Sequence, residues 1–516
     1  MALLIVGLIA ALSLRDGFSG DQALFLIYSK AINNGAILYR DVWDIKQPAI
    51  ICFYLIGGKL FGFTEIGIHL LELIYWLGLS ILLIFGLRKY FTNSLFAALI
   101  PLFTTGIYYT VSGSIHFTQA EGLVCFPMFL CLWFCQKFLE NPDKKHFLFL
   151  SGLFGGIVLT FKLMFLFILF GFWFCLFAYC YFLFTDRNAK HFAASIGLIL
   201  LGLMLPIVLF VFYFALNNAL GDLYYTTFVY PYNAVTAATR MENRSQVLIG
   251  GLQWFLKSYF PVILLTLFFL LYNLKSLFNN WLRKEKFALR RESFLFTGLF
   301  VWAFAGFAVI LIQRLSWWEY HYSLLMIPLG ILAVKCIGEI FEKIKSSAKL
   351  RRKTPAYLFT ALIITLLFIP TARRLFNKIR QSNRIETVVI GNRQIGVTGD
   401  ASEDYKSISA DTAFLASENP KAAIFIVSNP LYYYLSDLPP VFASNGAMSD
   451  MFTNFEWQRL NREMSEKTPK YVFVETRFIE PIREVNPVFI EILNTRYSVF
   501  STGARGSFYK LNELEK

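Results

Sequence analysis

Charged side chains are scarce in this sequence of 516 residues. Asp, Glu, Lys and Arg together make up 16% of it, whereas a typical soluble protein carries about 25%. In their place, hydrophobic residues make up 56% of the sequence, and phenylalanine alone occurs 56 times. Apolar runs of about 20 residues recur through the first two thirds of the chain, which is the length that a helix needs to cross a bilayer. This composition excludes an ordinary soluble protein and predicts a polytopic α-helical membrane protein.

Several other features are missing. None of the seven cysteines lies in residues 371–516, and all fall in apolar segments, so we expect no disulfide. No P-loop signature occurs, and we expect no soluble nucleotide site and no cofactor. The first apolar run lacks a basic flank and an A-x-A cleavage site, so we expect a retained helix rather than a signal peptide. We expect no metal site either, since Cys131 and Cys135, which share a helix face, lie among apolar residues.

Eleven apolar segments are predicted to span the membrane. They are residues 2–14, 66–87, 94–113, 122–139, 147–161, 163–184, 192–214, 252–272, 294–313, 322–341 and 356–370. The run from Phe147 to Phe184 is too long for one span, so we divide it into a hairpin with Lys162 at the tip. With the N-terminus in the cytoplasm, the inner loops hold 19 Lys and Arg, and the outer loops before residue 371 hold 9. The positive-inside rule therefore predicts a cytoplasmic N-terminus and an extracytoplasmic C-terminus in the inner (plasma) membrane.

Positive charge is concentrated in the membrane part. The formal net charge is +14, and residues 371–516 contribute only +1 of it, from 18 basic and 17 acidic side chains. Basic loops on the inner side of a membrane lie over anionic lipid. Membrane lipid is therefore an expected partner, and nucleic acid is not.

The last part of the chain, residues 371–516, has a different pattern. Segments 422–428, 471–475 and 507–511 are typical of strands, and segments 409–417, 454–467 and 487–495 are typical of helices. Strands that alternate with helices predict a small α/β domain. The predicted domains are thus a membrane domain, residues 1–370, and an extracytoplasmic α/β domain, residues 371–516.

The first outer loop gathers charged residues beside the bilayer. It contains Gly20-Asp21-Gln22 and then Tyr39-Arg40-Asp41-Val42-Trp43-Asp44-Ile45-Lys46-Gln47-Pro48. The amphipathic segments 22–33 and 49–61 are too short to span, so we expect both to lie at the interface. Asp21 is either the N-cap of the first segment or a catalytic group. The later residues form either an ordinary polar loop or a site with carboxylates and a phosphate-binding lysine.

These residues resemble the first periplasmic loop of bacterial members of the protein O-mannosyltransferase and aminoarabinose-transferase superfamily, which have the GT-C fold. The family pattern is Asp-Glu after the first helix and then D-x-K-P-P. Three later segments resemble family motifs in the same order: Glu121, Leu159-Thr160-Phe161-Lys162, and Glu319-Tyr320-His321-Tyr322 with Pro328. The tail resembles the periplasmic α/β domain of many members. The chain departs from the pattern at Gln22, which replaces the Glu, and at Gln47, which replaces the first Pro.

The resemblance implies a polyprenyl-phosphate-dependent, inverting glycosyltransferase, a hexosyl- or pentosyltransferase of the cell envelope. Its donor would be a polyprenyl-phosphate-linked sugar, and its acceptor a hydroxyl of a glycan, lipid or protein. Such a hydroxyl needs a base, and the leaving phosphate needs cations. By resemblance, the catalytic residues are Asp21 as general base and Glu121 as an assisting acid. The implied donor-phosphate ligands are Lys46, Lys162, Arg314 and His321, and the further substrate-contacting candidates are Asp41, Asp44 and Tyr322.

Each of these residues also has a simpler role open to it. Lys162 is equally a loop lysine that reaches the headgroups, and Arg314 and His321 are equally interfacial anchors. Glu121 is equally a residue that caps its helix or extends its side chain to the lipid headgroups. For the whole chain, the alternatives are a lipid-linked-glycan transporter or flippase, which would carry charges within its helices and repeated halves, and a non-catalytic membrane protein of the same fold.

Overall fold

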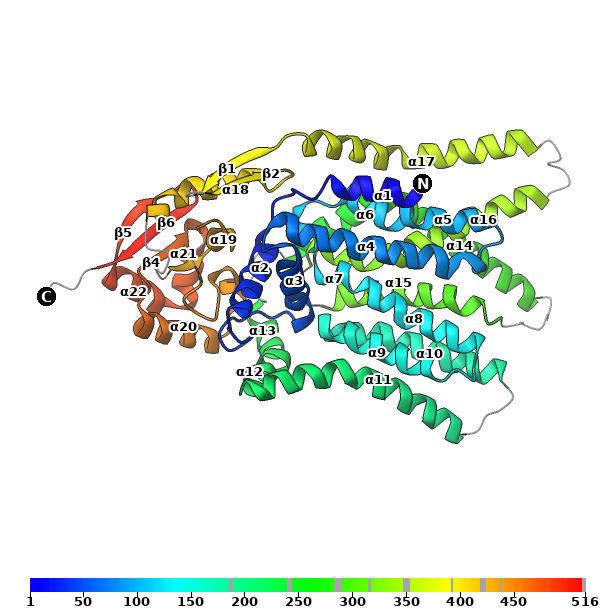
Figure 1. The fold of residues 1–516 in the computed structure, drawn as a ribbon, viewed down its shortest axis with the longest axis horizontal. Coiled ribbons are helices and arrows are strands. Elements are labelled where there is room, and N and C mark those ends of the chain that lie inside the picture. Colours follow the sequence, from blue (N-terminus) through cyan, green and yellow to red (C-terminus); the bar gives the residue numbers. More distant parts are fainter. Residues whose placement is uncertain are drawn as a thin grey trace.

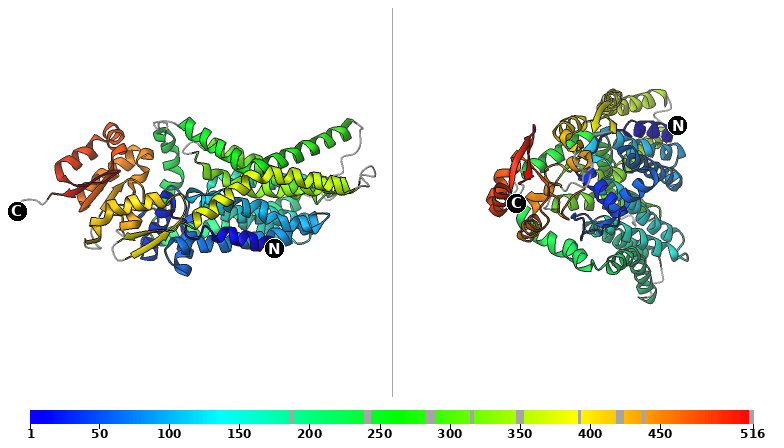
Figure 2. Two further views of the ribbon diagram at one scale, coloured as in Figure 1. Left: turned by 90° about the horizontal axis from the view of Figure 1, so that it is seen from above. Right: turned by 60° about the vertical axis from the view of Figure 1, so that its left-hand side comes forward.

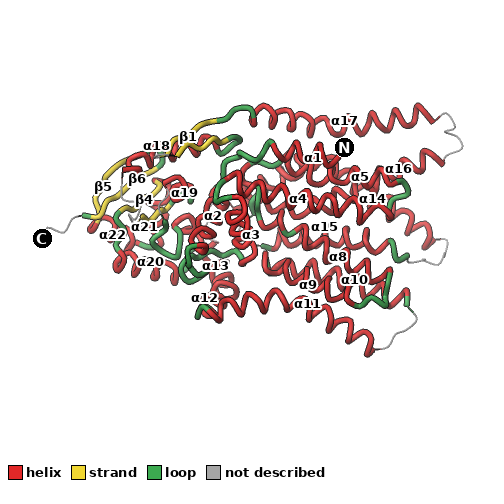
Figure 3. Tube along the Cα trace, viewed as in Figure 1, coloured by secondary structure: helices red, strands yellow, loops and turns green. Residues whose placement is uncertain are grey.

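The computed structural model describes residues 1–184, 189–238, 244–282, 290–313, 317–346, 353–390, 393–417, 424–436 and 439–512. Within these residues, long helices run side by side in one bundle, and a smaller domain that contains the strands lies at one end of it (Figures 1 and 3). The turned views of Figure 2 show the same arrangement. This confirms the predicted polytopic helical protein with a C-terminal α/β domain.

Eight helical segments of the described residues are long and apolar enough to cross a membrane. Their main helices are α4 (Glu65–Leu87), α5 (Ser94–Pro101) with α6 (Ile107–Val111), α7 (Ala120–Leu123) with α8 (Cys125–Glu140), α10 (Leu166–Leu183), α11 (Ala189–Leu216), α14 (Arg244–Leu282), α15 (Ser293–Ile312) and α16 (Met326–Ser346). A π-helical turn, Leu102–Gly106, joins α5 to α6 directly after Pro101. Proline has no N–H to donate, so the regular helical ladder is interrupted there.

Three further apolar helices are shorter, namely α1 (Ala2–Ala11), α3 (Pro48–Phe61) and α9 (His146–Phe161). Two of these, α1 and α9, correspond to predicted spans, so the count of about eleven spans is not confirmed. The break predicted at Lys162 is confirmed, because Lys162 lies between the end of α9 and the start of α10. The last predicted span belongs to α17 (Lys353–Ser382), which continues past residue 370 toward the strands (Figure 1). The domain boundary at residues 370 and 371 stays a prediction.

The two interfacial segments of the first loop are helical, as predicted. They form α2 (Gly20–Asn33) and α3, which lie between the bundle and the C-terminal domain (Figure 1). Pro48 occupies the first turn of α3, where a missing N–H costs nothing. The N-cap of α2 is Ser19, and Asp21 lies in the first turn. The capping interpretation of Asp21 is therefore wrong. The short helices α12 (Leu220–Tyr224) and α13 (Tyr230–Ala238) also lie near the C-terminal domain.

The C-terminal domain is built around a four-stranded sheet with the order β3-β4-β6-β5. Strands β3 and β4 are parallel, and the other pairs are antiparallel. A separate hairpin, β1-β2, precedes this sheet. The strands are β1 (Glu386–Ile390), β2 (Arg393–Val397), β3 (Ile424–Val427), β4 (Tyr471–Glu475), β5 (Tyr497–Thr502) and β6 (Gly506–Leu511). The helices are α18 (Ser402–Thr412), α19 (Leu431–Ser436), α20 (Asn454–Lys467), α21 (Thr476–Val485) and α22 (Pro487–Arg496).

Buried polar contacts attach this domain to the membrane part. Thr398 donates its hydroxyl to Asp16 Oδ1 at 2.9 Å, and Lys378 Nζ lies 3.5 Å from Asp16 Oδ2. Glu65, at the start of α4, accepts the hydroxyls of Tyr405 and Tyr434, both at 2.8 Å. Buried polar groups are costly to leave unpaired, so these bonds fix the domain in one place above the helices.

Candidate active site

Asp21 lies in the first turn of α2 and faces two other predicted segments. Lys46 Nζ is 3.6 Å from Asp21 Oδ2, and the Tyr320 hydroxyl donates to the same oxygen at 3.3 Å. The Asp21 side chain is 42% exposed. A carboxylate with this exposure is accessible to an incoming hydroxyl, whose proton it can accept.

Lys46 is held in place through its backbone. Its N–H donates to Asp44 Oδ1 at 2.9 Å, and its carbonyl accepts the Tyr39 hydroxyl at 2.8 Å. Burial disfavours the Lys46 ammonium, but the nearby Tyr320, Asp21, Glu121 and Asp44 outweigh it and raise the Lys46 pKa well above its usual range. Lys46 is therefore a permanent cation in the site.

A second cluster surrounds Glu121 at the start of α7. Lys162 Nζ lies 2.8 Å from Glu121 Oε1, and His321 Nε2 lies 3.4 Å from the same oxygen. Lys162 also donates to Gln313 Oε1 at 2.7 Å. The fold thus brings together residues from three distant motifs of the sequence. The two clusters are neighbours, since Tyr320 belongs to one and the adjacent His321 to the other.

A cavity of about 320 Å³, called the polar cavity below because charged side chains line part of it, opens around the first cluster. Its walls include Asp21, Asp44, Lys46 and Tyr320 from the membrane part, and Asn429 and Arg477 from the C-terminal domain. Asp44 is 3% exposed, and burial raises the pKa of its carboxyl to about 6.

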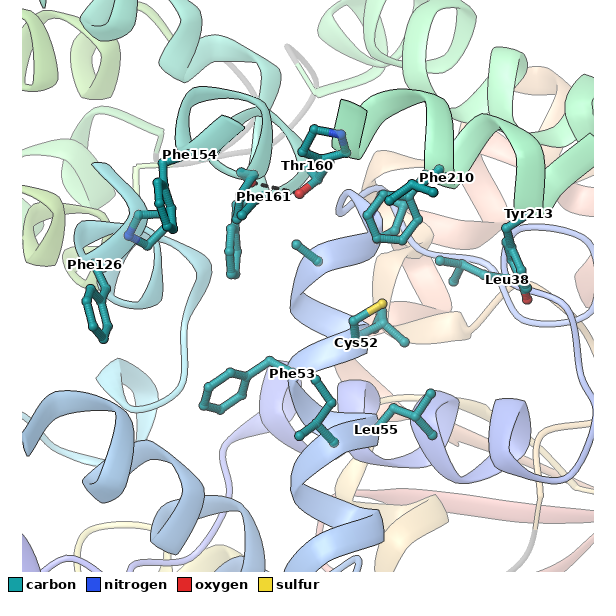
Figure 4. A pocket seen from close by; sticks show the side chains of 18 of the residues that line it. Leu38, Cys52, Phe53, Leu55, Phe126, Phe154, Thr160, Phe161, Phe210 and Tyr213 are labelled. Atoms are coloured by element: carbon teal, nitrogen blue, oxygen red, sulfur yellow. Dashed lines mark hydrogen bonds between the residues drawn. The ribbon is translucent and has the colours of Figure 1, made fainter. Parts of the chain in front are cut away.

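A much larger apolar cavity, of about 700 Å³, begins close to the polar one. Figure 4 shows Phe53, Leu55, Phe126, Phe154 and Phe210 around it. Most of the lining side chains come from α3, α8, α9 and α11, and Ile32 of α2, Leu38 and Tyr75 of α4 complete the lining. Both cavities adjoin the start of α3, because Lys46 lines the polar cavity and Pro48, two residues later, lines the apolar one. The charged residues of one cavity and the apolar lining of the other therefore lie within a few residues of each other along the chain.

Some predicted site residues belong neither to the lining of the polar cavity nor to the cluster around Glu121. Asp41 pairs with Arg40 at 3.0 Å and accepts the Ile37 N–H at 2.8 Å, so it stabilises its own loop. Tyr322 is buried and stacks on Phe255, with ring centroids 4.7 Å apart. Arg314 lies outside the described residues.

Other residues at the site were missed by the sequence prediction. Tyr320 lies in the segment Glu319-Tyr320-His321-Tyr322 next to the predicted His321, so this motif already contained a signal for it. Gln313 directly precedes Arg314, at the end of α15. Asn429 and Arg477 follow strands of the tail and carry no signal that links them to Asp21. Within the described residues, no group of three or more His, Cys, Asp or Glu side chains is placed to hold a metal ion.

Comparison with known proteins shows the fold but no closer relationship. No protein-family model matches the chain, and no curated protein sequence matches it. Among solved structures, ArnT from Cupriavidus metallidurans bound to undecaprenyl phosphate matches 98% of this chain and 96% of its own, with a TM-score of 0.58 and 12% identity. The apo state of the same ArnT gives a TM-score of 0.57 at the same coverage and identity. The chain therefore has the GT-C fold that its motifs predict, over nearly its whole length.

Proposed function

We propose that this protein is an inverting membrane glycosyltransferase that transfers a sugar from a polyprenyl-phosphate donor to an acceptor hydroxyl outside the cytoplasm of the cell. One observation carries the proposal: Asp21 and Lys46 face each other across 3.6 Å in a polar cavity that adjoins a large apolar one. That combination suits a base, a phosphate-binding cation and a lipid tail. The structural neighbour that was solved with undecaprenyl phosphate supports the donor class.

In the proposed reaction, Asp21 takes the proton of the acceptor hydroxyl. The acceptor oxygen then bonds to the anomeric carbon of the donor sugar, opposite the bond between that carbon and the phosphate. This second bond breaks, and the phosphate leaves with its electron pair. Lys46 stabilises the charge that develops on the phosphate, and inversion follows from the single displacement.

The second cluster would support the same step. We assign Glu121 the role of holding Lys162 and His321 in position, since both lie within 3.4 Å of its Oε1. Lys162, His321 and Arg314 would complete the phosphate site, and Asp44 would orient Lys46. The aliphatic chain of the donor would lie in the apolar cavity of Figure 4, beginning at Pro48.

Asp21→Asn tests the proposal directly. The protein, purified in detergent, would be given radiolabelled polyprenyl-phosphate sugars extracted from the membranes of its host, together with an envelope extract as acceptor. Asparagine keeps the size of the side chain but cannot accept the proton, and loss of a general base typically lowers the rate about 10²–10⁴-fold. Asp143→Asn, an exposed residue in the loop between α8 and α9, serves as the control and should keep full activity.

Two results would contradict the proposal. Full transfer by Asp21→Asn would place the base elsewhere. Absence of transfer by the wild-type protein with every extracted donor would leave the transporter and the non-catalytic protein as the better explanations.

A further inference from the structure

The C-terminal domain supplies one wall of the polar cavity. Ser428, Asn429 and Pro430, which follow β3, line it together with Arg477 and Phe478, which follow β4. Ala447 and Met451, from the short helical segment Gly446–Met451, are the other residues of the domain among the described lining residues. Most of this wall therefore comes from two short segments, called the two loops below: residues 428–430 after β3, and residues 476–478 after β4, which are also the first turn of α21.

The sheet topology explains why these two loops meet. Strands β3 and β4 are parallel neighbours in register, from Ile424 opposite Tyr471 to Val427 opposite Val474. The chain therefore leaves both strands at the same edge of the sheet. In α/β sheets, ligands bind at the carboxyl ends of parallel strands. Here the residues that follow these strands line the same cavity as Asp21.

One carboxylate ties the two loops together. Glu475, the last residue of β4, accepts the Ser428 hydroxyl at 2.6 Å and pairs with Arg477 Nε at 2.9 Å. Asn429, which lines the cavity, accepts the Leu431 N–H on its Oδ1 at 3.0 Å, and this bond fixes the orientation of its amide. These bonds preorganise the wall, which reduces the cost of binding a ligand there.

The wall carries a planar guanidinium next to an aromatic ring and lies close to Asp21. The Arg477 guanidinium carbon is 4.7 Å from the centre of the Phe478 ring, and the Arg477 side chain is 69% exposed. At Gly20, the residue before Asp21, an added Cβ would lie 3.4 Å from Asn429 Oδ1. The loop after β3 therefore reaches the first turn of α2.

We infer that these two loops bind the acceptor, and that the acceptor is a hydroxyl-rich saccharide. The inference rests on the proposed function. Phe478 and the Arg477 guanidinium offer planar faces on which the C–H groups of a sugar ring can pack, since an aromatic face carries negative charge density. Asn429 and Arg477 offer hydrogen-bond donors to its hydroxyls. The donor occupies the opposite side, where the lysines and the apolar cavity lie.

The test uses Arg477→Ala and Phe478→Ala in the full-length protein. We expect the KM for a saccharide acceptor to rise about tenfold or more, while the KM for the lipid-linked donor and the binding of undecaprenyl phosphate stay at the wild-type values.

Arg483→Ala is the matched control, because Arg483 is an exposed arginine of the same helix α21 that pairs with Glu480 and does not line the cavity. Thermal unfolding of each variant identifies loss of folding, and Arg477→Lys gives a milder second variant, which keeps the charge and loses the planar group.

The outcomes separate this inference from the proposed function. A raised donor KM with an unchanged acceptor KM would overturn the acceptor assignment alone, as would wild-type values for both variants. Transfer to protein but not to saccharide acceptors would overturn the ligand class. If the wild-type protein transfers no sugar, the proposed function fails first, and this assignment of an acceptor fails with it.

Discussion

At the residue scale, Gln22 shows how a departure from a family pattern can be structural. Its Oε1 accepts the Ser19 N–H at 2.7 Å, and its Nε2 donates to the Phe117 carbonyl at 2.9 Å and to Thr118 Oγ1 at 3.0 Å. The side chain is fully buried. A glutamate has no N–H to donate to the carbonyl. The amide therefore fixes the residue next to Asp21 in a way that the family's acid would not.

The first prediction follows from these bonds. Gln22→Glu, which restores the family residue, should destabilise the protein by roughly 1–3 kcal/mol, the cost of leaving buried polar partners unsatisfied, and should lower transfer. Thermal unfolding and transfer rates measure the two effects. Gln458→Glu, at an exposed position in α20, should change neither. A Gln22→Glu protein that is as stable and more active than wild type would show that the missing carboxylate matters for chemistry instead.

The second prediction concerns Asp44, whose carboxyl pKa is raised from 3.8 to about 6 by burial. Between these values, the unfolded chain releases the proton and the folded protein keeps it, so stability falls as pH rises from about 4 to 6. The full shift corresponds to at most roughly 3 kcal/mol. Asp44→Asn removes this titration.

Thermal unfolding of both proteins at several pH values tests this. The melting temperature of Asp44→Asn, relative to wild type, should increase between pH 4 and pH 7. A difference that does not change with pH would mean that folding leaves the Asp44 pKa at its unfolded value.

At the element scale, local patterns predicted some elements well and missed others. Helix α20 begins and ends where the sequence predicts, because Thr453 caps it and Glu456 completes the capping box. The hairpin β1-β2 was missed. Its first strand follows α17 after only three residues, and its polar residues give no clear alternation. The short helices α19 and α21 were missed as well, since they are stabilised by tertiary contacts such as the buried Leu431 and Ile482.

The third prediction concerns the packing of α9 against α11. Gly152 and Gly156 in α9 and Gly202 in α11 form the contact, and small residues of this kind let helix backbones approach closely in a membrane. An added Cβ at Gly202 would lie 2.1 Å from the Phe149 carbonyl oxygen, whereas one at Gly197 would meet nothing within 4 Å. Both glycines belong to the same helix, so they make a matched pair.

We expect Gly202→Ala to push α11 away from α9 and to lower the melting temperature, while Gly197→Ala leaves it unchanged or slightly raised. Because Leu209 and Phe210 of α11 line the apolar cavity, the proposed function further predicts that Gly202→Ala weakens binding of the lipid-linked donor. Equal melting temperatures for the two variants would show that the helices adjust without cost.

At the scale of the whole molecule, the sequence predicted the architecture better than the site. Apolar runs are long and local, so they indicate the bundle directly, and motif order indicates the GT-C fold. The sequence also indicated Asp21, Lys46, Glu121 and Lys162 through short motifs, and the fold brings them into two neighbouring clusters; their roles in catalysis stay predictions. The sequence did not indicate that Asn429 and Arg477 form a wall of the polar cavity. That wall exists only because parallel strands far along the chain place two loops above α2.

The fourth prediction concerns the orientation of the whole molecule in the membrane. The C-terminal ends of α14 and α16 lie at the end of the bundle away from the C-terminal domain (Figure 1), and basic residues cluster in the sequence that follows each of them. By the positive-inside rule, that end faces the cytoplasm. The C-terminal domain and the polar cavity then face outward.

Alkaline phosphatase is active only where its disulfides form, outside the cytoplasm. A fusion at Lys516 should therefore be active and a fusion at Lys284 inactive, and a fluorescent protein that folds only in the cytoplasm should give the opposite pattern at the same two positions. Activity at Lys284 without activity at Lys516 would invert the topology and would place Asp21 on the cytoplasmic side, where the proposed reaction has no place.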